Sequence, residues 1–424
     1  MQQIILHNGL LMMLHPMPNT HSVTISLNIR AGSGYGEPHR GITHFLEHLH
    51  FRRMGDMTQR DLYYQMECIG STLRAVTYRD MLRFSMKVVP VCLDKCLDIF
   101  VRLIEAREWT EEDVELERQV VLNQIYEKGS YVSAEQAMRE SVFKNHPLSW
   151  DIMGTPEDVL QITREALQQY KAEIFDASRM ILCVTGNVTP AQIQMIQCRF
   201  GQCTIAYRAK DKVMALPAGF HRRKPDVQFV HVNDNNPLDV QLSFDITYQS
   251  WDWGLLTILN CILGEGVGSR LQRCLREEKC YSSNVSSYVE WYSDFAVLHI
   301  TFSVGRNQCL AALEDALAVV HGLQSDIQKS DLDVSLPFYT TNQVFLEDDT
   351  EEMNAQISVC AVRFRQCYQP LSLTNTTDTI RSLRQLASQI FTASNLTMVI
   401  VGNTNRFTKK SFRQLTEILD KGDA

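Results

Sequence analysis

Two histidines and a glutamate lie within five residues of one another in the segment GITHFLEHLHF, residues 41–51. His44, Glu47 and His48 form the pattern H-x-x-E-H. On a helix, residues three and four apart share a face, so both imidazoles would point the same way. Two such imidazoles can bind one zinc ion, and the adjacent carboxylate can take a proton from a zinc-bound water. The alternative is a set of polar residues on the surface of an ordinary helix.

A catalytic zinc site with three protein ligands needs one more residue than the two histidines provide. The acidic segment 111–127 is the natural donor, because it reads as a helix with several carboxylates. This helix is expected to begin at Thr110, where Thr-Glu-Glu-Asp is typical of a capped N-terminus with acidic residues in its first turn. The fold must therefore bring this helix against the one that carries the histidines.

The elements that position these residues follow from hydrophobic periodicity and turn signals. The sequence predicts a strand at 21–30, a loop at 31–38, helices at 41–53 and 58–69, paired strands at 71–76 and 81–89, and helices at 93–107 and 110–128. Thr58 is the expected cap of the second helix. Since strands and helices do not strictly alternate, we expect an α+β fold with helices on one face of antiparallel sheets.

An internal repeat divides the chain. Residues 175–187 resemble residues 391–403, with Phe, Ala, Ser, Gly and Asn recurring at one constant offset, the one that separates Gly186 from Gly402. A constant offset of half the chain indicates two similar halves. We therefore expect an N-terminal domain at 1–208, a linker at 209–225 and a homologous C-terminal domain at 226–424.

Composition narrows the functional classes. The 424 residues carry a net charge of −8, which gives no general attraction for nucleic acid. No apolar run is long enough to span a membrane. The 12 cysteines are scattered and form no C-x-x-C pair, which is typical of reduced thiols. We expect a cytoplasmic protein that binds neither nucleic acid nor membrane.

Several segments together carry a family resemblance that spans nearly the whole chain. These segments are 30–33, 41–51, 73–80, 117–122 and 275–279. In combination they resemble the pitrilysin/insulinase family of zinc peptidases, which includes the mitochondrial processing peptidase. The resemblance implies two homologous α+β domains of the LuxS/processing-peptidase-like fold in a clamshell arrangement. It also implies a peptide substrate, a Zn²⁺ cofactor, and a homodimer or a heterodimer with a related subunit.

The resemblance also implies residue roles. His44 and His48 would be zinc ligands, Glu47 would be the general base, and Glu117 would support a ligand from behind. The family's third ligand is a glutamate, but the matching position here is Gln124. Its neutral carbonyl oxygen would hold zinc less tightly. Glu127, one turn further along, or a carboxylate of a partner chain could substitute.

Substrate-binding positions are the remaining implication. The segment 73–77 matches the sheet edge to which a peptide would add, with Arg74, Ala75 and Thr77 as substrate-binding residues. Arg74 replaces the family's usual asparagine. In the second half Arg276 matches a family arginine, but Ser283 occupies the position of the family tyrosine. Tyr281, Tyr288 or a partner subunit would then replace that tyrosine.

These observations favour a zinc endopeptidase that cleaves peptides or leader peptides through a metal-activated water. The alternative is a non-catalytic or weakly active subunit of a heterodimeric peptidase, which the altered residues at Gln124 and Ser283 favour. A structural zinc protein fits poorly, because structural sites are closed by four protein ligands, mostly cysteine.

Overall fold

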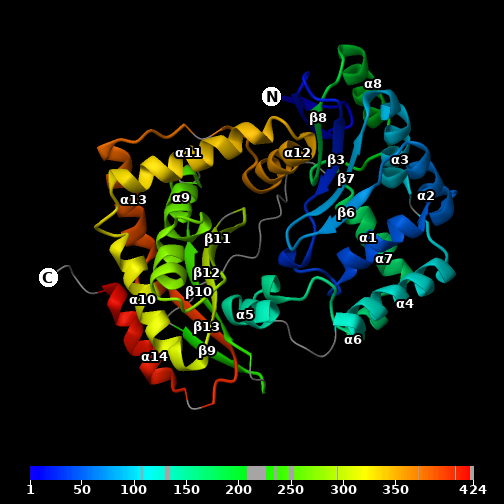
Figure 1. The fold of residues 1–424 in the computed structure, drawn as a ribbon. Coiled ribbons are helices and arrows are strands. Elements are labelled where there is room, and N and C mark those ends of the chain that lie inside the picture. Colours follow the sequence, from blue (N-terminus) through cyan, green and yellow to red (C-terminus); the bar gives the residue numbers. More distant parts are fainter. Residues whose placement is uncertain are drawn as a thin grey trace. The chain divides into compact units, whose positions relative to one another are not determined.

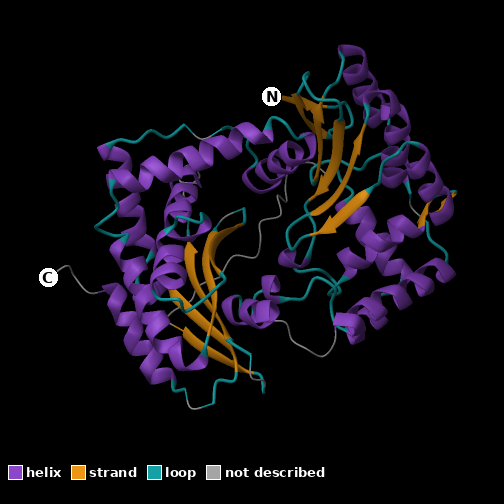
Figure 2. Cartoon of the chain, in the orientation of Figure 1, coloured by secondary structure: helices purple, strands orange, loops and turns teal. Residues whose placement is uncertain are grey.

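The computed structural model describes residues 1–106, 108–128, 134–207, 226–233, 236–247, 253–293, 295–370, 372–405 and 407–420. The chain forms two compact α+β units (Figures 1 and 2). Unit 1 comprises residues 1–131, 145–218 and 344–369, and unit 2 comprises residues 132–144, 219–343 and 370–424. The linker expected at 209–225 lies outside the described residues.

Unit 1 is built on a six-stranded sheet with the strand order β1-β2-β8-β3-β7-β6. Its strands are β1 Gln2–Ile5, β2 Leu11–Pro16, β3 Val23–Ile29, β6 Arg74–Thr77, β7 Leu82–Val88 and β8 Met180–Gly186. All neighbouring strands are antiparallel except β2 and β8, which are parallel. A short hairpin of β4 Arg53–Met54 and β5 Met57–Thr58 lies outside this sheet.

Seven helices share a hydrophobic core with one face of the unit 1 sheet. They are α1 Ile42–Arg52, α2 Gln59–Cys68, α3 Leu93–Glu105, α4 Glu111–Lys128, α6 Pro156–Gln161, α7 Arg164–Ile174 and α8 Pro190–Gly201. The predicted elements of this half are confirmed, with ends that differ from the prediction by at most three residues. Thr58 caps α2 in a reciprocal capping box with Asp61, as its sequence indicates.

Unit 2 repeats the same plan with a sheet in the order β11-β12-β10-β13-β9. Its strands are β9 Asp226–His231, β10 Leu238–Ile246, β11 Val285–Trp291, β12 Ala296–Val304 and β13 Leu396–Gly402. Its helices are α9 Trp253–Asn260, α10 Cys309–Gly322, α11 Lys329–Leu346, whose last turn enters unit 1, α13 Thr377–Ile390 and α14 Lys409–Thr416. The strand β13 pairs with β9 in parallel and with β10 antiparallel, as β8 pairs with β2 and β3. The internal repeat is therefore confirmed.

Two helices are exchanged between the halves of the sequence. Helix α12, Thr350–Val359, lies in the C-terminal half but packs on β3 and β8 of unit 1. Helix α5, Ala134–Val142, lies in the N-terminal half but packs on β10 and β13 of unit 2. The first residues of the two helices are separated by the same offset as Gly186 and Gly402, so the exchange is part of the repeat. The compact units are therefore discontinuous, unlike the contiguous domains expected from the sequence.

The exchange corrects the expectation that helices cover one sheet face only. In β3, Val23, Ile25 and Leu27 belong to the main core, whereas Thr24 and Ser26 face α12 and are fully buried. Their polar side chains make the strand look half-exposed in the sequence. The second face is instead buried by a helix that arrives from the other half of the sequence.

Two sequence-level features can also be followed in the structure. All 12 cysteines are free thiols. None of the helices within the described residues is both long and apolar enough to cross a lipid bilayer.

Candidate active site

Helix α1 presents the H-x-x-E-H residues on the face opposite to its buried side. Gly41 precedes the helix with a φ of 82°, and a side chain there would meet the carbonyl oxygen of Met153 at 2.3 Å. Only glycine fits this start. Helical residues such as Phe45 and Leu49 are fully buried, while the three site residues are half-buried. The rings of His44 and His48 lie 4.7 Å apart between centroids.

A buried carboxylate orients His48. Glu117 on α4 is 5% exposed, and its Oε1 lies 2.8 Å from Nδ1 of His48. Its other oxygen accepts a hydrogen bond of 2.8 Å from Nε of Arg52. When Nδ1 of an imidazole donates to a carboxylate, Nε2 is left as the basic nitrogen for a metal. The geometry thus provides the support that the family resemblance implies for Glu117.

Glu47 lies beside the two histidines in a partly desolvated position. Burial raises the pKa of Glu47 above its usual value, and a hydrogen bond from Oγ1 of Thr77 partly opposes that shift. Thr77 ends β6, so the sheet edge and the helix meet at this carboxylate. A carboxyl group whose pKa lies nearer neutrality is better suited to accept and return a proton.

Contacts along α1 and α4 show that the two helices are antiparallel. Arg53 pairs with Asp113, and the guanidinium of Arg118 lies 5.4 Å from the ring centroid of Phe45. Together with the contact of Glu117 with His48, these pairs bring later residues of α4 beside earlier residues of α1. Gln124 lies two turns after Glu117 on the same helical face, so this register carries it toward the turn of His44.

No carboxylate completes the metal site within the part of the chain that the structure describes. No group of three His, Cys, Asp or Glu residues there could hold a metal ion. Gln124 is half-buried, whereas Glu127 is exposed one turn further along. At the position on α4 where the family resemblance implies a third, acidic ligand, the chain therefore carries the neutral Gln124.

The predicted substrate strand lies at an open sheet edge. β6 pairs with β7 on one side and has no strand on the other among the described residues. Arg74 is exposed and pairs with Glu351 at 2.8 Å, while Ala75 packs against the core and Val76 is 44% exposed. An exposed ion pair contributes little stability, so Arg74 can exchange Glu351 for another partner. The edge is thus geometrically open to an added strand.

Comparison with known proteins identifies the fold and the family. Residues 11–156 match the family model described as insulinase, peptidase family M16, and residues 161–336 match the model described as the peptidase M16 inactive domain. The chain belongs to the M16 family of peptidases. The match of the second half to an inactive domain agrees with its sequence. The repeat offset pairs His44, Glu47 and His48 with Asn260, Leu263 and Gly264, so unit 2 lacks the motif.

Relatives of this M16 chain include bacterial and mitochondrial proteins. The "uncharacterized zinc protease YmxG" of Bacillus subtilis is 27% identical over 71% of this chain and 73% of its own length. A mitochondrial-processing peptidase subunit beta of Caenorhabditis elegans is 23% identical over 90% of this chain and 86% of its own. A protease from Helicobacter pylori shares the fold with a TM-score of 0.83 and 19% identity, over 94% and 98% of the two chains. A chain of complex III2 from Candida albicans shares it with a TM-score of 0.79 and 13% identity, over 98% and 99%.

Arg276 and the two tyrosines that could replace the M16 family tyrosine, Tyr281 and Tyr288, belong to unit 2. Arg276 is exposed on the π-helical segment Gln272–Glu278. Tyr281 is half-buried against the core of unit 2, and desolvation together with a hydrogen bond to Asp315 raises the pKa of Tyr281. Tyr288 on β11 is 42% exposed and lies with its ring 5.0 Å from that of His299. The hydroxyl of Tyr281 is therefore already hydrogen-bonded, to Asp315, whereas the side chain of Tyr288 is more accessible to solvent.

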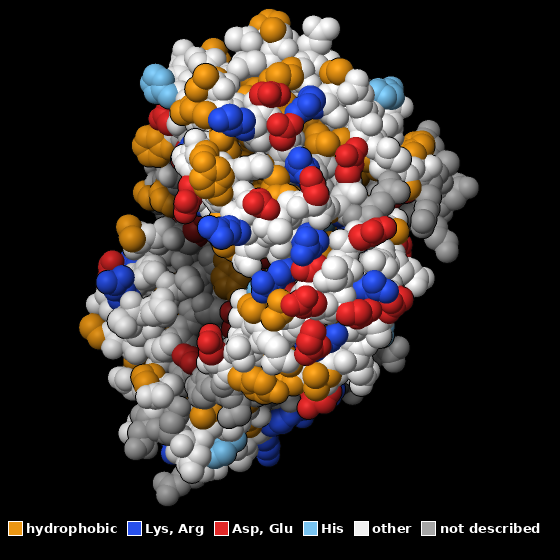
Figure 3. All heavy atoms as spheres, turned by 90° about the vertical axis from the view of Figure 1, so that its right-hand side faces the viewer, with side chains coloured by type: hydrophobic (Ala, Val, Ile, Leu, Met, Phe, Trp, Pro, Cys, Tyr) orange, Lys and Arg blue, Asp and Glu red, His pale blue; other side chains and the backbone are white. Residues whose placement is uncertain are grey.

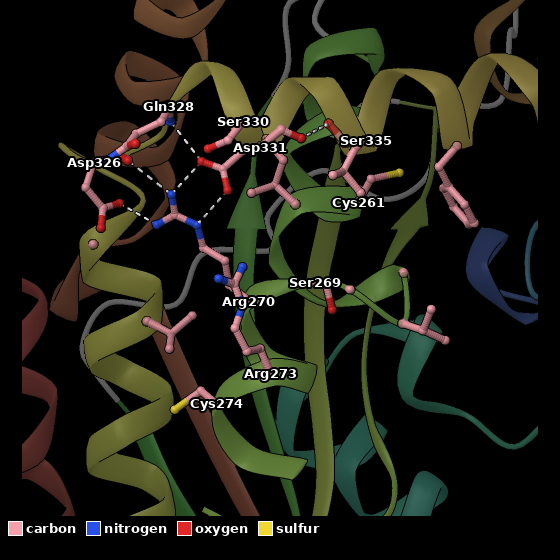
Figure 4. A pocket seen from close by; sticks show the side chains of 18 of the residues that line it. Cys261, Ser269, Arg270, Arg273, Cys274, Asp326, Gln328, Ser330, Asp331 and Ser335 are labelled. Carbon is pink, nitrogen blue, oxygen red and sulfur yellow. Dashed lines mark hydrogen bonds and ion pairs between the residues drawn. The ribbon is translucent and has the colours of Figure 1, made fainter. Parts of the chain in front are cut away.

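A cavity of about 790 Å³ in unit 2 is lined by neither Arg276 nor Tyr281 (Figure 4). Arg270 spans part of it and is held by Asp326 and Asp331, the latter at 2.7 Å. Acidic and basic side chains are also interspersed over the face shown in Figure 3, without a large patch of one sign. Within the cavity, the charge of Arg270 is thus balanced by the two aspartates.

Sequence reasoning missed one residue that positions α1. Glu37 is 9% exposed and accepts hydrogen bonds from the backbone N–H groups of Gly41 at 3.2 Å and Thr43 at 3.3 Å. Burial raises the pKa of Glu37 to about 7, against these hydrogen bonds. Thr43 in turn shares a hydrogen bond of 2.7 Å with Tyr170. A carboxylate shortly before a helix start is the sequence signal that could have suggested this role.

Proposed function

We propose that this protein is a zinc-dependent endopeptidase that cleaves peptides or peptide precursors, with Glu47 as its general base. The observation that carries the proposal is the arrangement on α1. His44 and His48 share one face, His48 is oriented by the buried Glu117, and Glu47 lies beside them. A structural role alone gives no reason for a partly desolvated carboxylate next to two imidazoles.

The donor set fits zinc, though weakly at the third position. Two imidazoles, one of them backed by a carboxylate, are ligands that zinc prefers. Gln124 would add a neutral carbonyl oxygen. A zinc ion held by these residues would supply Lewis acidity to the scissile carbonyl and to the attacking water.

The residues of the chain would carry out the remaining work. The open edge of β6 would take the peptide backbone as an added strand, which gives affinity with loose side-chain specificity. Glu47 would accept the proton of the attacking water and return it to the leaving amine. Thr77 would hold the Glu47 carboxylate in place through its hydroxyl. We place this activity in the cytoplasm, where free cysteines stay reduced.

The second candidate is a non-catalytic or weakly active subunit of a heterodimeric M16 peptidase. The specific observation in its favour is the lack of a third acidic ligand within the described residues. A related subunit, or a second copy of this chain, would then supply what Gln124 and Ser283 lack. Metal analysis of the purified protein distinguishes the two candidates. A protein that is isolated without zinc, and whose melting temperature and peptide cleavage do not respond to added zinc, is not the proposed enzyme.

The test of the general base is Glu47→Gln. Glutamine keeps the shape of the side chain but cannot accept a proton, so cleavage should fall by at least about a hundredfold. Zinc content should remain at the wild-type level, because Glu47 is not a ligand. Cleavage of a quenched fluorescent peptide and metal content are measured on the same preparation. Cleavage that persists in the variant would place the base elsewhere.

A further inference from the structure

Arg30, Arg363 and Arg365 all lie near enough to the half-buried Tyr35 to act electrostatically on its hydroxyl. Arg363 forms a two-point ion pair with Asp80, with distances of 2.7 Å from Nε and 3.0 Å from Nη2 to the two carboxylate oxygens. Arg30 donates from Nε and Nη2 to two carbonyl oxygens of the π-helical segment Cys360–Phe364, at 3.1 and 3.3 Å. Asp80 is 2% exposed, so this pair is fixed within unit 1.

Arg365 is the third arginine, and it differs from the other two. It is exposed, and no hydrogen bond or ion pair occupies its guanidinium group among the described residues. Its backbone adopts a left-handed conformation with φ of 54°. Arg365 ends the π-helical segment, where a left-handed residue is common, and its backbone N–H donates to the carbonyl oxygen of Cys360.

The cluster carries more positive than negative charge. Burial and Arg365 both lower the pKa of Arg30, with burial the larger cause, so the two guanidinium groups repel one another. Burial and the Asp80 carboxylate raise the pKa of Tyr35 to about 12, which keeps its hydroxyl neutral. In the described part of the chain, the charged groups that act on the Tyr35 hydroxyl are thus three guanidinium groups and the carboxylate of Asp80. An additional anion would relieve this repulsion.

The turn that follows β6 connects the cluster to the proposed general base, Glu47. Thr77, which donates to Glu47, is three residues before Asp80. The loop of Tyr35 is joined to the same turn, because the N–H of Gly34 donates to the carbonyl oxygen of Arg79 at 2.7 Å. A peptide that adds to the edge of β6 and reaches Glu47 would therefore pass the cluster within about three or four residues of the scissile bond.

We propose that Arg365 binds a carboxylate of the peptide substrate, next to the positive charges of Arg30 and Arg363. The protein then prefers peptides with an acidic side chain, or a free C-terminus, a few residues from the scissile bond. The guanidinium group of Arg365 suits this role, because it can bind a carboxylate through two parallel hydrogen bonds. Nε and Nη2 of Arg30 and of Arg363 are already occupied, so these two arginines contribute mainly their charge. This inference rests on the proposed function, since it places the peptide along β6. A peptide antiparallel to β6 would offer a carboxylate on its N-terminal side, and a parallel one on its C-terminal side.

The experiment measures binding to the Glu47→Gln protein, so that peptides stay intact. A fluorescent peptide is compared with a series in which one glutamate replaces glutamine at each position in turn. Each peptide carries either a free or an amidated C-terminus, which separates a side-chain carboxylate from a terminal one. We expect one position, or the free terminus, to bind about tenfold more tightly, and this gain to shrink at high salt.

Arg365→Asn tests the assignment, because asparagine removes the charge and tolerates the left-handed backbone. It should remove most of the tenfold gain, leave the affinity of the glutamine peptide unchanged, and keep or raise the melting temperature. Arg381→Asn is the matched control, since Arg381 is an exposed arginine of unit 2 whose side chain is 75% exposed. The Arg381 variant should leave the affinities of both the acidic and the neutral peptides unchanged.

The outcomes separate this inference from the proposed function. If acidic and neutral peptides bind equally at every position and with both termini, the proposal of a carboxylate-binding site is wrong. The proposal that the protein is a peptidase is not affected by that result. A preference that survives Arg365→Asn also overturns the assignment. If the protein with Glu47 intact cleaves no peptide in the series, the proposed function fails on its own account.

Discussion

At the level of single residues, the unusual position of this site is Gln124. The resemblance to M16 peptidases expects a glutamate there, and the antiparallel register of α1 and α4 carries Gln124 toward the turn of His44. An amide oxygen is a weaker zinc ligand than a carboxylate, because it brings no charge to a divalent cation. In the proposed zinc site, this residue would therefore determine how strongly the two histidines retain the metal.

Gln124→Glu should tighten zinc binding by about tenfold or more, because a carboxylate replaces a neutral oxygen beside two imidazoles. Competition with a chelator of known affinity measures the change. Asn123→Asp, at an exposed position on the same helix, is the matched control and should have little effect. An unchanged zinc affinity in the Gln124 variant would mean that this side chain does not reach the metal.

Glu37 gives a second prediction at this scale. Its pKa is raised from about 4.5 to about 7, so the folded state favours the protonated form. Its contribution to stability is then fully present below pH 4.5 and is lost as the pH rises through 7. In the wild type, ionisation of Glu37 should lower the free energy of unfolding by an amount on the order of 3 kcal/mol between pH 5 and 8, and Glu37→Gln should remove this decrease. Urea unfolding of both proteins across this range measures it, and parallel curves would contradict the prediction. Glu47 affects both proteins equally and cancels.

At the level of elements, the packing of α12 on the unit 1 sheet is unusually polar. Asn354 is fully buried, and its amide makes five hydrogen bonds. It accepts from Ser26, Arg83 and, at 3.5 Å, Ser358, and it donates to the carbonyl oxygens of Thr24 and Cys183. A buried amide whose bonding capacity is filled fixes the register of a helix more strictly than apolar packing does. This network explains how a helix from the other half of the sequence finds one position on β3.

Asn354→Leu should lower the free energy of unfolding by about 2–4 kcal/mol, because the buried partners lose their hydrogen bonds. Gln356→Leu makes the same chemical change at a half-buried position of α12 and should stay within about 0.5 kcal/mol of the wild type. Thermal and urea unfolding of the purified variants measure both. If Asn354→Leu is as stable as the wild type, the hydrogen-bond network sets the position of α12 on the sheet but does not add to the free energy of unfolding.

At the level of the whole molecule, the reciprocal exchange of α5 and α12 links the two units. In each unit, one face of the sheet is covered by a helix that lies in the other half of the sequence. Neither half of the sequence therefore contains a complete unit. The polar face of β3 would be left open if residues 344–369 were missing.

A fragment of residues 1–208 should consequently be much less stable than the same region in the intact chain. Adding a synthetic peptide of residues 344–369 should raise its melting temperature in a concentration-dependent way, because the peptide binds the folded form only. The same peptide with Asn354→Leu should stabilise it less. A fragment that is fully stable alone, and indifferent to the peptide, would show that the exchange is dispensable.

Much of the local structure could be predicted, because local patterns encode it. The capping pattern at Thr58 predicts the start of its helix, and the repeat around Gly186 and Gly402 indicates two similar halves. The helix exchange could not be predicted. Thr24 and Ser26 look like solvent-facing residues of a half-buried strand until the partner helix is known. Similarly, nothing local to Glu37 shows that its carboxylate will be buried.

The sequence by itself determined the family to which the chain belongs and the candidate residues for the proposed chemistry, which are the motif on α1 and the glutamine at 124. Residue type and spacing are enough for this, since a helix places positions three and four apart on one face. Only the tertiary structure decided which side chains meet. Glu117 contacts the motif from α4 and Thr77 from the end of β6, and the arginine cluster combines segments from both halves of the sequence. Such contacts depend on the packing of whole elements, which no local pattern specifies.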